Sequence, residues 1–111
     1  MKVISSGENH LEFDNGLIIS GLGDQDCCAF NFIDFDQFVV GEEFPTLTAG
    51  QFVDTASFKD DGFALKDSQG LPKWAQARSE QNGYYSNMTT LEAEYDGKTI
   101  KVAELSGDVS Y

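Results

Sequence analysis

The sequence predicts a mainly β fold of the α+β class: a single small antiparallel sheet of five to seven short strands with one short helix. Three observations lead to this prediction. Short runs in which apolar and polar residues alternate recur along the 111-residue chain, Asn-Gly and Asp-Gly pairs separate several of them, and helical spacing appears only briefly. Hydrophobic residues make up 41% of the sequence and include nine Phe, which is enough apolar material for one packed domain over residues 1–111.

The first predicted hairpin turns at Asn15-Gly16. A two-residue hairpin loop needs positive φ at both positions, and Asn and Gly adopt it more readily than other residues. With these two residues as the loop, Phe13 lies opposite Ile18, and Leu11 and Phe13 share a face with Ile18.

The middle of the chain is less regular. Residues 27–35 alternate Phe with smaller residues and predict a strand that is buried on one side. Residues 35–39 place Phe and Val at helical spacing, so they predict one or two helical turns with Asp34 as the N-cap and Gly41 at the end. Residues 47–58 fit a short helix and a strand equally well.

Two further strands are predicted at residues 62–66 and 74–80, on either side of a Gly-Leu-Pro turn. Trp74 is expected in the core of the sheet. Asn82-Gly83 marks another turn, and Tyr84-Tyr85 directly after it fit either the core or an interaction surface.

The clearest local signal is a hairpin over residues 91–105 that turns at Asp96-Gly97. The expected cross-strand pairs are Tyr95–Lys98, Glu94–Thr99, Ala93–Ile100, Glu92–Lys101 and Leu91–Val102. The apolar members of the last three pairs fall on one face, and the opposite charges of Glu92 and Lys101 meet on the other.

The charge distribution is the most unusual feature of the chain. No Lys or Arg occurs from residue 3 to residue 58, whereas ten carboxylates do, and the formal net charge of the whole chain is −12. A field of this sign repels nucleic acid and anionic membranes, and it attracts basic protein clefts.

Several of these carboxylates are separated by one residue, which places them on one face of a strand roughly 6.6 Å apart. That separation is on the scale of neighbouring phosphates, so a sheet bearing several pairs would imitate a nucleic-acid backbone before a row of Lys and Arg. The same pairs are also ordinary on the solvated face of an amphipathic strand. The candidate partner-binding residues are Glu12, Asp14, Asp24, Asp26, Asp34, Asp36, Glu42 and Glu43.

Asp24-Gln25-Asp26-Cys27-Cys28, with His10 as a further ligand, is a candidate metal site. A structural zinc site needs four ligands at recognisable spacing, and the chain has two Cys and one His. A calcium loop needs more oxygen ligands than Asp-x-Asp supplies. We therefore predict no metal and no cofactor, and we interpret the string as a turn before a strand in which the Cys are small apolar residues.

No phosphate-binding loop, nucleophile elbow or zinc-protease motif is present, and nothing marks out one carboxylate pair as an acid and a base, so we predict no enzyme. No apolar run approaches the roughly 20 residues that span a bilayer, and the N-terminus lacks the apolar core of a secretory signal. Together with two adjacent cysteines, which suit a reducing compartment, these features predict a soluble, cytoplasmic protein.

Two strings together resemble a family of small phage and prophage proteins of unknown function. The first is the acidic segment ending in Cys27-Cys28 with Asp34-Phe35-Asp36 after it, and the second is Asn82-Gly83-Tyr84-Tyr85-Ser86. The resemblance implies an origin in a mobile element and assigns no catalytic residue. Small acidic proteins of such origin include inhibitors of restriction and CRISPR nucleases, several of which imitate DNA, so this is an analogy of class.

The sequence therefore leads to one principal hypothesis. The chain is expected to occupy the basic nucleic-acid-binding cleft of a host defence nuclease, a CRISPR effector being the specific expectation, and to act in the host cytoplasm by steric and electrostatic competition. The alternative is a non-enzymatic structural or metal-stabilised phage protein that uses Cys27, Cys28 and His10. An acid–base hydrolase is the third hypothesis, and it would require a concave site with one carboxyl of raised pKa.

Overall fold

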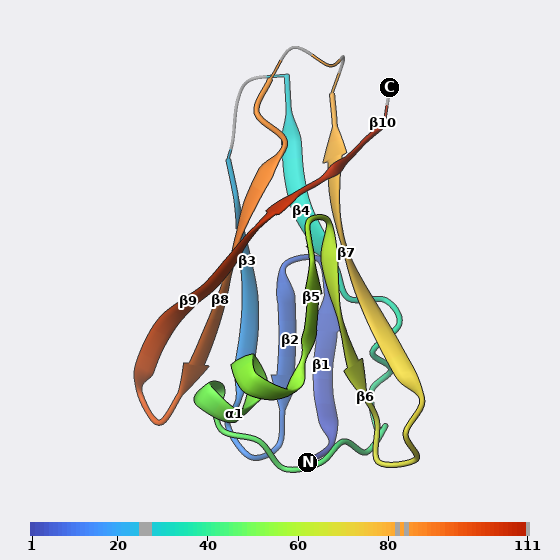
Figure 1. Cartoon of the computed structure of the whole chain (residues 1–111), viewed down its shortest axis with the longest axis vertical. Helices are drawn as coiled ribbons and strands as arrows, with labels where there is room; N and C mark the ends of the chain where they lie inside the picture. The colour runs from blue at the N-terminus through green and yellow to red at the C-terminus, as the bar shows by residue number, and fades with distance from the viewer. Residues whose placement is uncertain (25–27, 82, 84, 111) are drawn as a thin grey trace.

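The computed structural model describes residues 1–24, 28–81, 83 and 85–110, apart from the Ser110 side chain. Within these ranges the chain forms ten strands and one helix in an elongated body of 40 × 27 × 22 Å (Figure 1). The elements are β1 (Val3–Gly7), β2 (His10–Phe13), β3 (Ile18–Gly23), β4 (Phe30–Asp34), α1 (Ala49–Thr55), β5 (Ser57–Lys59), β6 (Gly62–Lys66), β7 (Pro72–Glu80), β8 (Met88–Tyr95), β9 (Lys98–Ser106) and β10 (Asp108–Ser110).

The mainly β composition with one short helix is confirmed, but the single predicted sheet is wrong. The strands form two sheets: a first sheet in the order β1-β2-β3-β8-β9, and a second sheet in which β7 pairs with β4, β6 and β10, and β5 pairs with β6. All pairs are antiparallel except that of β10 with β7. Alternation along a strand indicates that one face is buried, but it does not say which other element covers that face, and here the two sheets cover each other.

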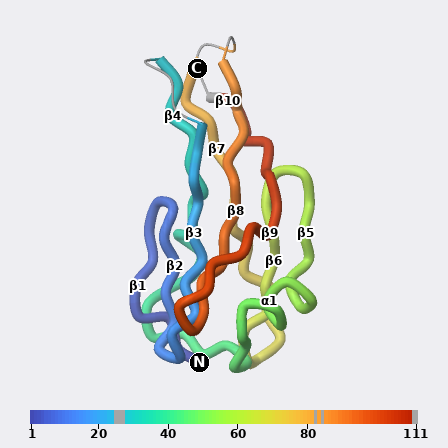
Figure 2. The backbone as a smooth tube through the Cα atoms, turned by 90° about the vertical axis from the view of Figure 1, so that its left-hand side faces the viewer, coloured from blue at the N-terminus to red at the C-terminus, as the bar shows by residue number. Residues whose placement is uncertain are grey.

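Two of the connections between the sheets are a chain crossing and a pair of hydrogen bonds. Gly107 alone separates β9 of the first sheet from β10 of the second, and the chain crosses between them there (Figure 2). At the other junction Asn9 has a positive φ of 61°, its amide N–H donates to the Ile33 carbonyl at 2.9 Å, and its Oδ1 accepts the Ile33 N–H at 2.8 Å. Asn9 thus pairs with β4 as a strand residue would, which connects the end of β1 to the second sheet.

The core between the sheets is rich in phenylalanine. Six Phe side chains are fully buried: Phe13, Phe35, Phe38, Phe44, Phe52 and Phe63. Their ring centroids approach to 5.3–6.1 Å, mostly at steep angles that suit aromatic quadrupoles. This aromatic packing is the main apolar cluster of the fold.

The ambiguous segment 47–58 contains both structures that the sequence allowed. Thr48 and Gln51 form a capping box at the start of α1, Phe52 inserts into the core, and the chain then continues as β5. Helix α1 lies at the same end of the molecule as the N-terminus (Figure 1). No described helix is long and apolar enough to cross a membrane.

The predicted register of the first hairpin is wrong by one residue. The Gly16 N–H donates to the Phe13 carbonyl, the Phe13 N–H donates to the Leu17 carbonyl, and Glu12 pairs with Ile18. The loop therefore has three residues, and within it only Gly16 has positive φ, as in a turn that ends in a glycine bulge. Because one residue of slip exchanges the faces of a strand, Ile19 rather than Ile18 is buried beside Leu11 and Phe13.

The predicted register of the last hairpin is confirmed over its first four pairs. Asp96 and Gly97 both have positive φ, and the strands pair as expected from Tyr95–Lys98 to Glu92–Lys101. A bulge between Leu91 and Glu92 then shifts the register, so Leu91 lies opposite Ala103 and not Val102. Ile100 was expected on the buried face with Leu91 and Ala93, but it is 39% exposed.

The helical turns predicted for residues 35–39 are wrong. The side-chain Oδ1 of Asp34 accepts the Asp36 N–H, and the Phe38 N–H donates to the Phe35 carbonyl, which makes a turn and no helix. Asp34 can satisfy a nearby amide in a turn as well as at a helix N-terminus, so its side chain does not discriminate between them.

The strands predicted at 62–66 and 74–80 are confirmed, with β7 beginning two residues earlier at Pro72. The strand predicted at 27–35 is shorter, since β4 begins at Phe30 and residue 27 lies outside the described ranges. The turn predicted at Asn82-Gly83 falls partly outside them as well, and Gly83 has a positive φ of 93°.

Candidate functional site

The structure does not gather the predicted partner-binding carboxylates onto one surface. Asp14 lies in the turn between β2 and β3, at the N-terminal end of the molecule, whereas Asp24 follows β3 at the opposite end (Figure 1). The six extended residues of β3 place roughly 20 Å between these two ends. Asp26 lies outside the described residues.

Three of the predicted carboxylates form ion pairs with Lys, Arg or the N-terminal ammonium. Glu43 lies 3.7 Å from the Lys2 Nζ and from the N-terminal ammonium, Glu42 lies 3.0 Å from the Lys73 Nζ, and Asp34 lies 2.9 Å from the Arg78 Nε. These contacts reduce the negative field that the carboxylates present to a partner.

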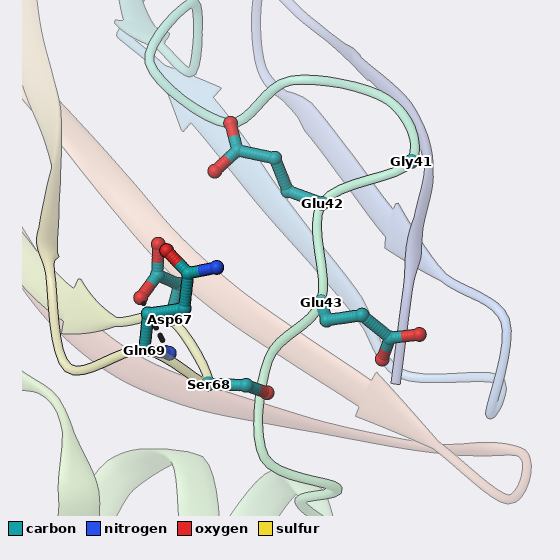
Figure 3. Close-up of a pocket in the computed structure, with 6 residues that line it drawn as sticks. All are labelled: Gly41, Glu42, Glu43, Asp67, Ser68 and Gln69. Carbon is teal, nitrogen blue, oxygen red and sulfur yellow. Dashed lines mark hydrogen bonds between the residues drawn. The ribbon is translucent and has the colours of Figure 1, made fainter.

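Glu42 and Glu43 also line a hollow of about 580 Å³ with Asp67 (Figure 3). Figure 3 shows the two glutamates pointing away from each other. The Asp67 carboxylate accepts the backbone N–H groups of Gln69 and Leu71, each at 2.9 Å, so it stabilises the β6–β7 turn. The carboxylates of this hollow therefore diverge, and they do not form a common site.

The pKa of Asp34 lies below the ordinary value for an aspartate. Burial raises its pKa, but the hydrogen bonds from the Asp36 N–H and from Arg78, together with the Arg78 charge, outweigh burial and leave the pKa lowered. Asp34 is thus held as a carboxylate. A lowered pKa is the opposite of what a general acid requires, so this residue does not supply the raised pKa that the hydrolase hypothesis would need.

A different set of carboxylates shares one surface, the outer face of the first sheet. Leu11, Ile19 and Leu91 point inward, so their strand neighbours point outward. In the sheet register Glu12 lies beside Ile18, and Ile18 lies beside Glu94. The next row runs from His10 through Ser20 to Glu92 on strands β2, β3 and β8.

We call Glu12, Glu92 and Glu94 the acidic face. Glu92 and Glu94 follow each other on β8 at roughly 7 Å, and Glu12 is two strands away at roughly 10 Å. Neither Glu92 nor Glu94 makes an ion pair or a side-chain hydrogen bond with another described residue. Glu12 lies 3.4 Å from the His10 Nε2.

No Lys or Arg occurs in β2 and β8, which carry the acidic face, or in β1 and β3, whereas β9 on the other side of β8 carries Lys98 and Lys101. Lys101 on β9 lies opposite Glu92 in the register, but its Nζ contacts Glu104 at 2.8 Å. The acidic face therefore keeps its negative charge, which a partner would experience at close range.

Only part of the acidic face was predicted from the sequence. Glu12 is among the predicted partner-binding residues. Glu92 and Glu94 are also a carboxylate pair separated by one residue, and Glu92 is the predicted partner of Lys101, but the predicted partner-binding set does not include them. Nothing local links residue 12 to residue 94, because their proximity depends on the pairing of β3 with β8.

The two strings that carry the family resemblance meet at the end of the molecule opposite the N-terminus. The Ser86 Oγ donates to the Asp24 carboxylate at 2.7 Å, although the residues are 62 positions apart. The buried Asn31 donates its amide to the carbonyls of Asp24 and Ser86, and the buried Gln81 donates to Ser86 and accepts the Tyr85 N–H. This polar network ties the two loops together.

The metal hypothesis gains no ligand cluster within the described part of the chain. No group of three or more His, Cys, Asp or Glu side chains there could hold a metal ion. His10 contacts Glu12 on the first sheet, and Cys28 is exposed just before β4. Cys27 lies outside the described residues.

Trp74 was expected in the core, and this is wrong. It is half-buried on the outer face of the second sheet, because Ala75 and Ala77 are the residues of β7 that point inward. The signal was present in the sequence: Trp74 alternates in phase with Gln76 and Arg78, and polar neighbours at this spacing indicate a solvated face.

Comparisons with protein-family models, with curated proteins and with solved structures gave no match for this chain.

Proposed function

We propose that the chain is a non-catalytic interaction protein whose acidic face binds a basic surface of a nucleic-acid-handling protein. The observation that carries the proposal is the cluster of Glu12 on β2 with Glu92 and Glu94 on β8, two strands that contain no Lys or Arg and are joined by β3, which contains none either. The sheet fixes the spacing of the backbone positions that carry these carboxylates, so they can meet an array of guanidinium and ammonium groups at a set spacing.

The net charge of −12 supports the same proposal. A protein with this charge is steered toward basic clefts and away from nucleic acid, and this steering weakens as salt screens it. The preferred partner is a host defence nuclease, with a CRISPR effector as the specific candidate, in the cytoplasm of a bacterial host. The chain would act by occupying the cleft, with no turnover.

Most of the carboxylates that the sequence predicted to bind a partner have no principal role in this proposal. The predicted residues Asp34, Glu42 and Glu43 are paired with bases, and Asp14 accepts the backbone N–H of Lys2, so we assign them no principal role in partner binding. Glu12 is the member of the predicted set that the proposal retains.

The experiment is a retention assay with the heparin-binding fraction of a bacterial lysate, which is enriched in nucleic-acid-binding proteins. The immobilised chain is expected to retain a discrete protein at low salt and to release it at high salt. The triple variant E12K/E92K/E94K is expected to lose this retention.

A matched variant, D54K/E80K/D108K, changes the net charge by the same amount at exposed positions outside the acidic face. It is expected to keep most of the retention. Equal loss in the two triple variants would mean that net charge alone is responsible, and unchanged retention in E12K/E92K/E94K would refute the acidic face as the binding surface.

A further inference from the structure

A second hollow lies on the outer face of the second sheet, whereas the acidic face lies on the outer face of the first sheet. It has a volume of about 190 Å³, and we call it the Trp74 hollow. Its lining residues are Asp34, Asp36, Gln37, Trp74, Gln76 and Arg78. This volume is smaller than that of typical small-molecule sites, and it suits a single side chain better than a whole ligand.

The indole of Trp74 is fixed in place by its surroundings. Its Nε1 donates to the Gln76 Oε1 at 2.7 Å, and the Gln76 amide in turn donates to Asp61 and to the Ala77 carbonyl. The indole also lies on Gly62, where an added Cβ would be only 2.5 Å from the ring atom Cζ2. Aromatic rings held in this way can bind without first losing conformational freedom.

The charges of the hollow do not cancel. Asp34 and Arg78 form an ion pair at 2.9 Å and neutralise each other, whereas Asp36 is exposed and makes no ion pair with a described residue. One negative charge therefore remains beside the indole. A monovalent cation would balance it.

We propose that the Trp74 hollow binds an arginine side chain presented by another protein. The guanidinium would stack on the indole and donate hydrogen bonds to the Asp36 carboxylate. Arginine fits better than lysine, because a flat guanidinium can stack on a ring and bond a carboxylate with two parallel N–H groups. The inference does not depend on the acidic face, which lies on the other sheet.

The test uses the intrinsic fluorescence of Trp74, the only tryptophan in the chain. The probe is N-acetyl-L-arginine methylamide, and the control probe is the citrulline counterpart, which has the same shape without the charge. The arginine probe is expected to give a saturable change, and the citrulline probe is expected to bind about tenfold more weakly or not at all.

Two variants locate the binding. Asp36→Asn is expected to weaken the arginine response about tenfold, because it removes a charge-assisted hydrogen bond. Asp54→Asn removes the same charge from the exposed surface of α1 and is expected to leave the response unchanged. Equal responses to arginine and citrulline, equal responses in the two variants, or a saturable response to methyl glucoside with none to arginine would each overturn the inference.

The E12K/E92K/E94K variant separates this inference from the proposed function. It is expected to keep the full arginine response while it loses protein retention. Loss of the arginine response in this variant would place the binding on the acidic face and would overturn the assignment to the Trp74 hollow.

Discussion

The carboxylates on the two outer faces of the molecule differ in whether a basic side chain neutralises them. On the first sheet, Glu92 and Glu94 stand without a basic neighbour in contact, and Glu12 has only a histidine. On the second sheet, Asp34 is paired with Arg78 and lies in a network of hydrogen bonds. The difference shows that the number of carboxylates in a sequence does not define an acidic surface, because the fold decides which of them are neutralised.

The outer face of the second sheet should be the more sensitive to substitution, since its side chains are hydrogen-bonded and packed against one another. Gly62→Ala is expected to destabilise the protein by about 2 kcal/mol, because the new Cβ would collide with the Ala75 carbonyl oxygen and with the indole of Trp74. Chemical denaturation followed by Trp74 fluorescence measures this. Gly50→Ala is the control, since a Cβ there meets nothing within 4 Å on α1, and it should stabilise by about 0.5 kcal/mol. A Gly62→Ala protein as stable as the wild type would show that the indole is not seated on this glycine.

The Asp34–Arg78 pair should contribute a smaller amount. Arg78→Met is expected to cost about 1 kcal/mol, because the half-buried Asp34 carboxylate loses a partner and the pair is only partly shielded from solvent. A double-mutant cycle with Asp34→Asn isolates the coupling in denaturation experiments. Additive effects of the two substitutions would mean that the ion pair contributes nothing.

The pH dependence of stability should reflect the lowered pKa of Asp34. A carboxyl whose pKa is lower in the folded state than its ordinary value of 3.8 stabilises the fold above that value, and this contribution is lost as the pH falls through the folded pKa. The stability difference between the wild type and Asp34→Asn should therefore be largest near neutral pH and should shrink in acid. Denaturation curves over this range provide the measurement, and a difference that stays constant with pH would contradict the assignment.

Substitutions on the acidic face should have the smallest effects on stability, and they should stabilise the protein where the substitutions above destabilise it. Replacing Glu92 and Glu94 by Gln is expected to stabilise the protein by a few tenths of a kcal/mol, since it removes repulsion between like charges. The wild type should also gain stability with moderate salt, and this gain should be smaller in the double variant. Thermal melting at low and moderate salt measures both. A larger salt response in the variant than in the wild type would contradict repulsion on this face.

Local sequence patterns predicted most of the strands and turns. They failed where contacts between distant segments determine the length of a turn or the assembly of the sheets. Asp96-Gly97 set both the turn and most of the register of the last hairpin, because both residues have the positive φ that the loop requires. Asn15-Gly16 marked a turn correctly but not its length, since the Asn15 amide is used to bind the Leu47 carbonyl, 32 residues away. The second sheet could not be predicted, because nothing in a single strand states which element will cover it.

The candidate site was less predictable than the fold. The pairing of Asp34 with Arg78 joins residues 44 positions apart, and the meeting of Glu12 with Glu94 depends on β3 lying between them. Carboxylate spacing along the sequence identified pairs on a strand, but not which pairs would acquire a base from another strand. Trp74 is a different case: it was wrongly predicted in the core, although its polar neighbours Gln76 and Arg78 on alternate positions indicate a solvated face.

The central claim is that the acidic face takes the place of nucleic acid on a basic protein. The most direct measurement is displacement of labelled DNA or RNA from the protein retained in the lysate experiment, followed by fluorescence anisotropy. The wild-type chain should release the nucleic acid stoichiometrically, and E12K/E92K/E94K should not, while D54K/E80K/D108K should. Binding of the wild-type chain alongside undisturbed nucleic acid would contradict the claim.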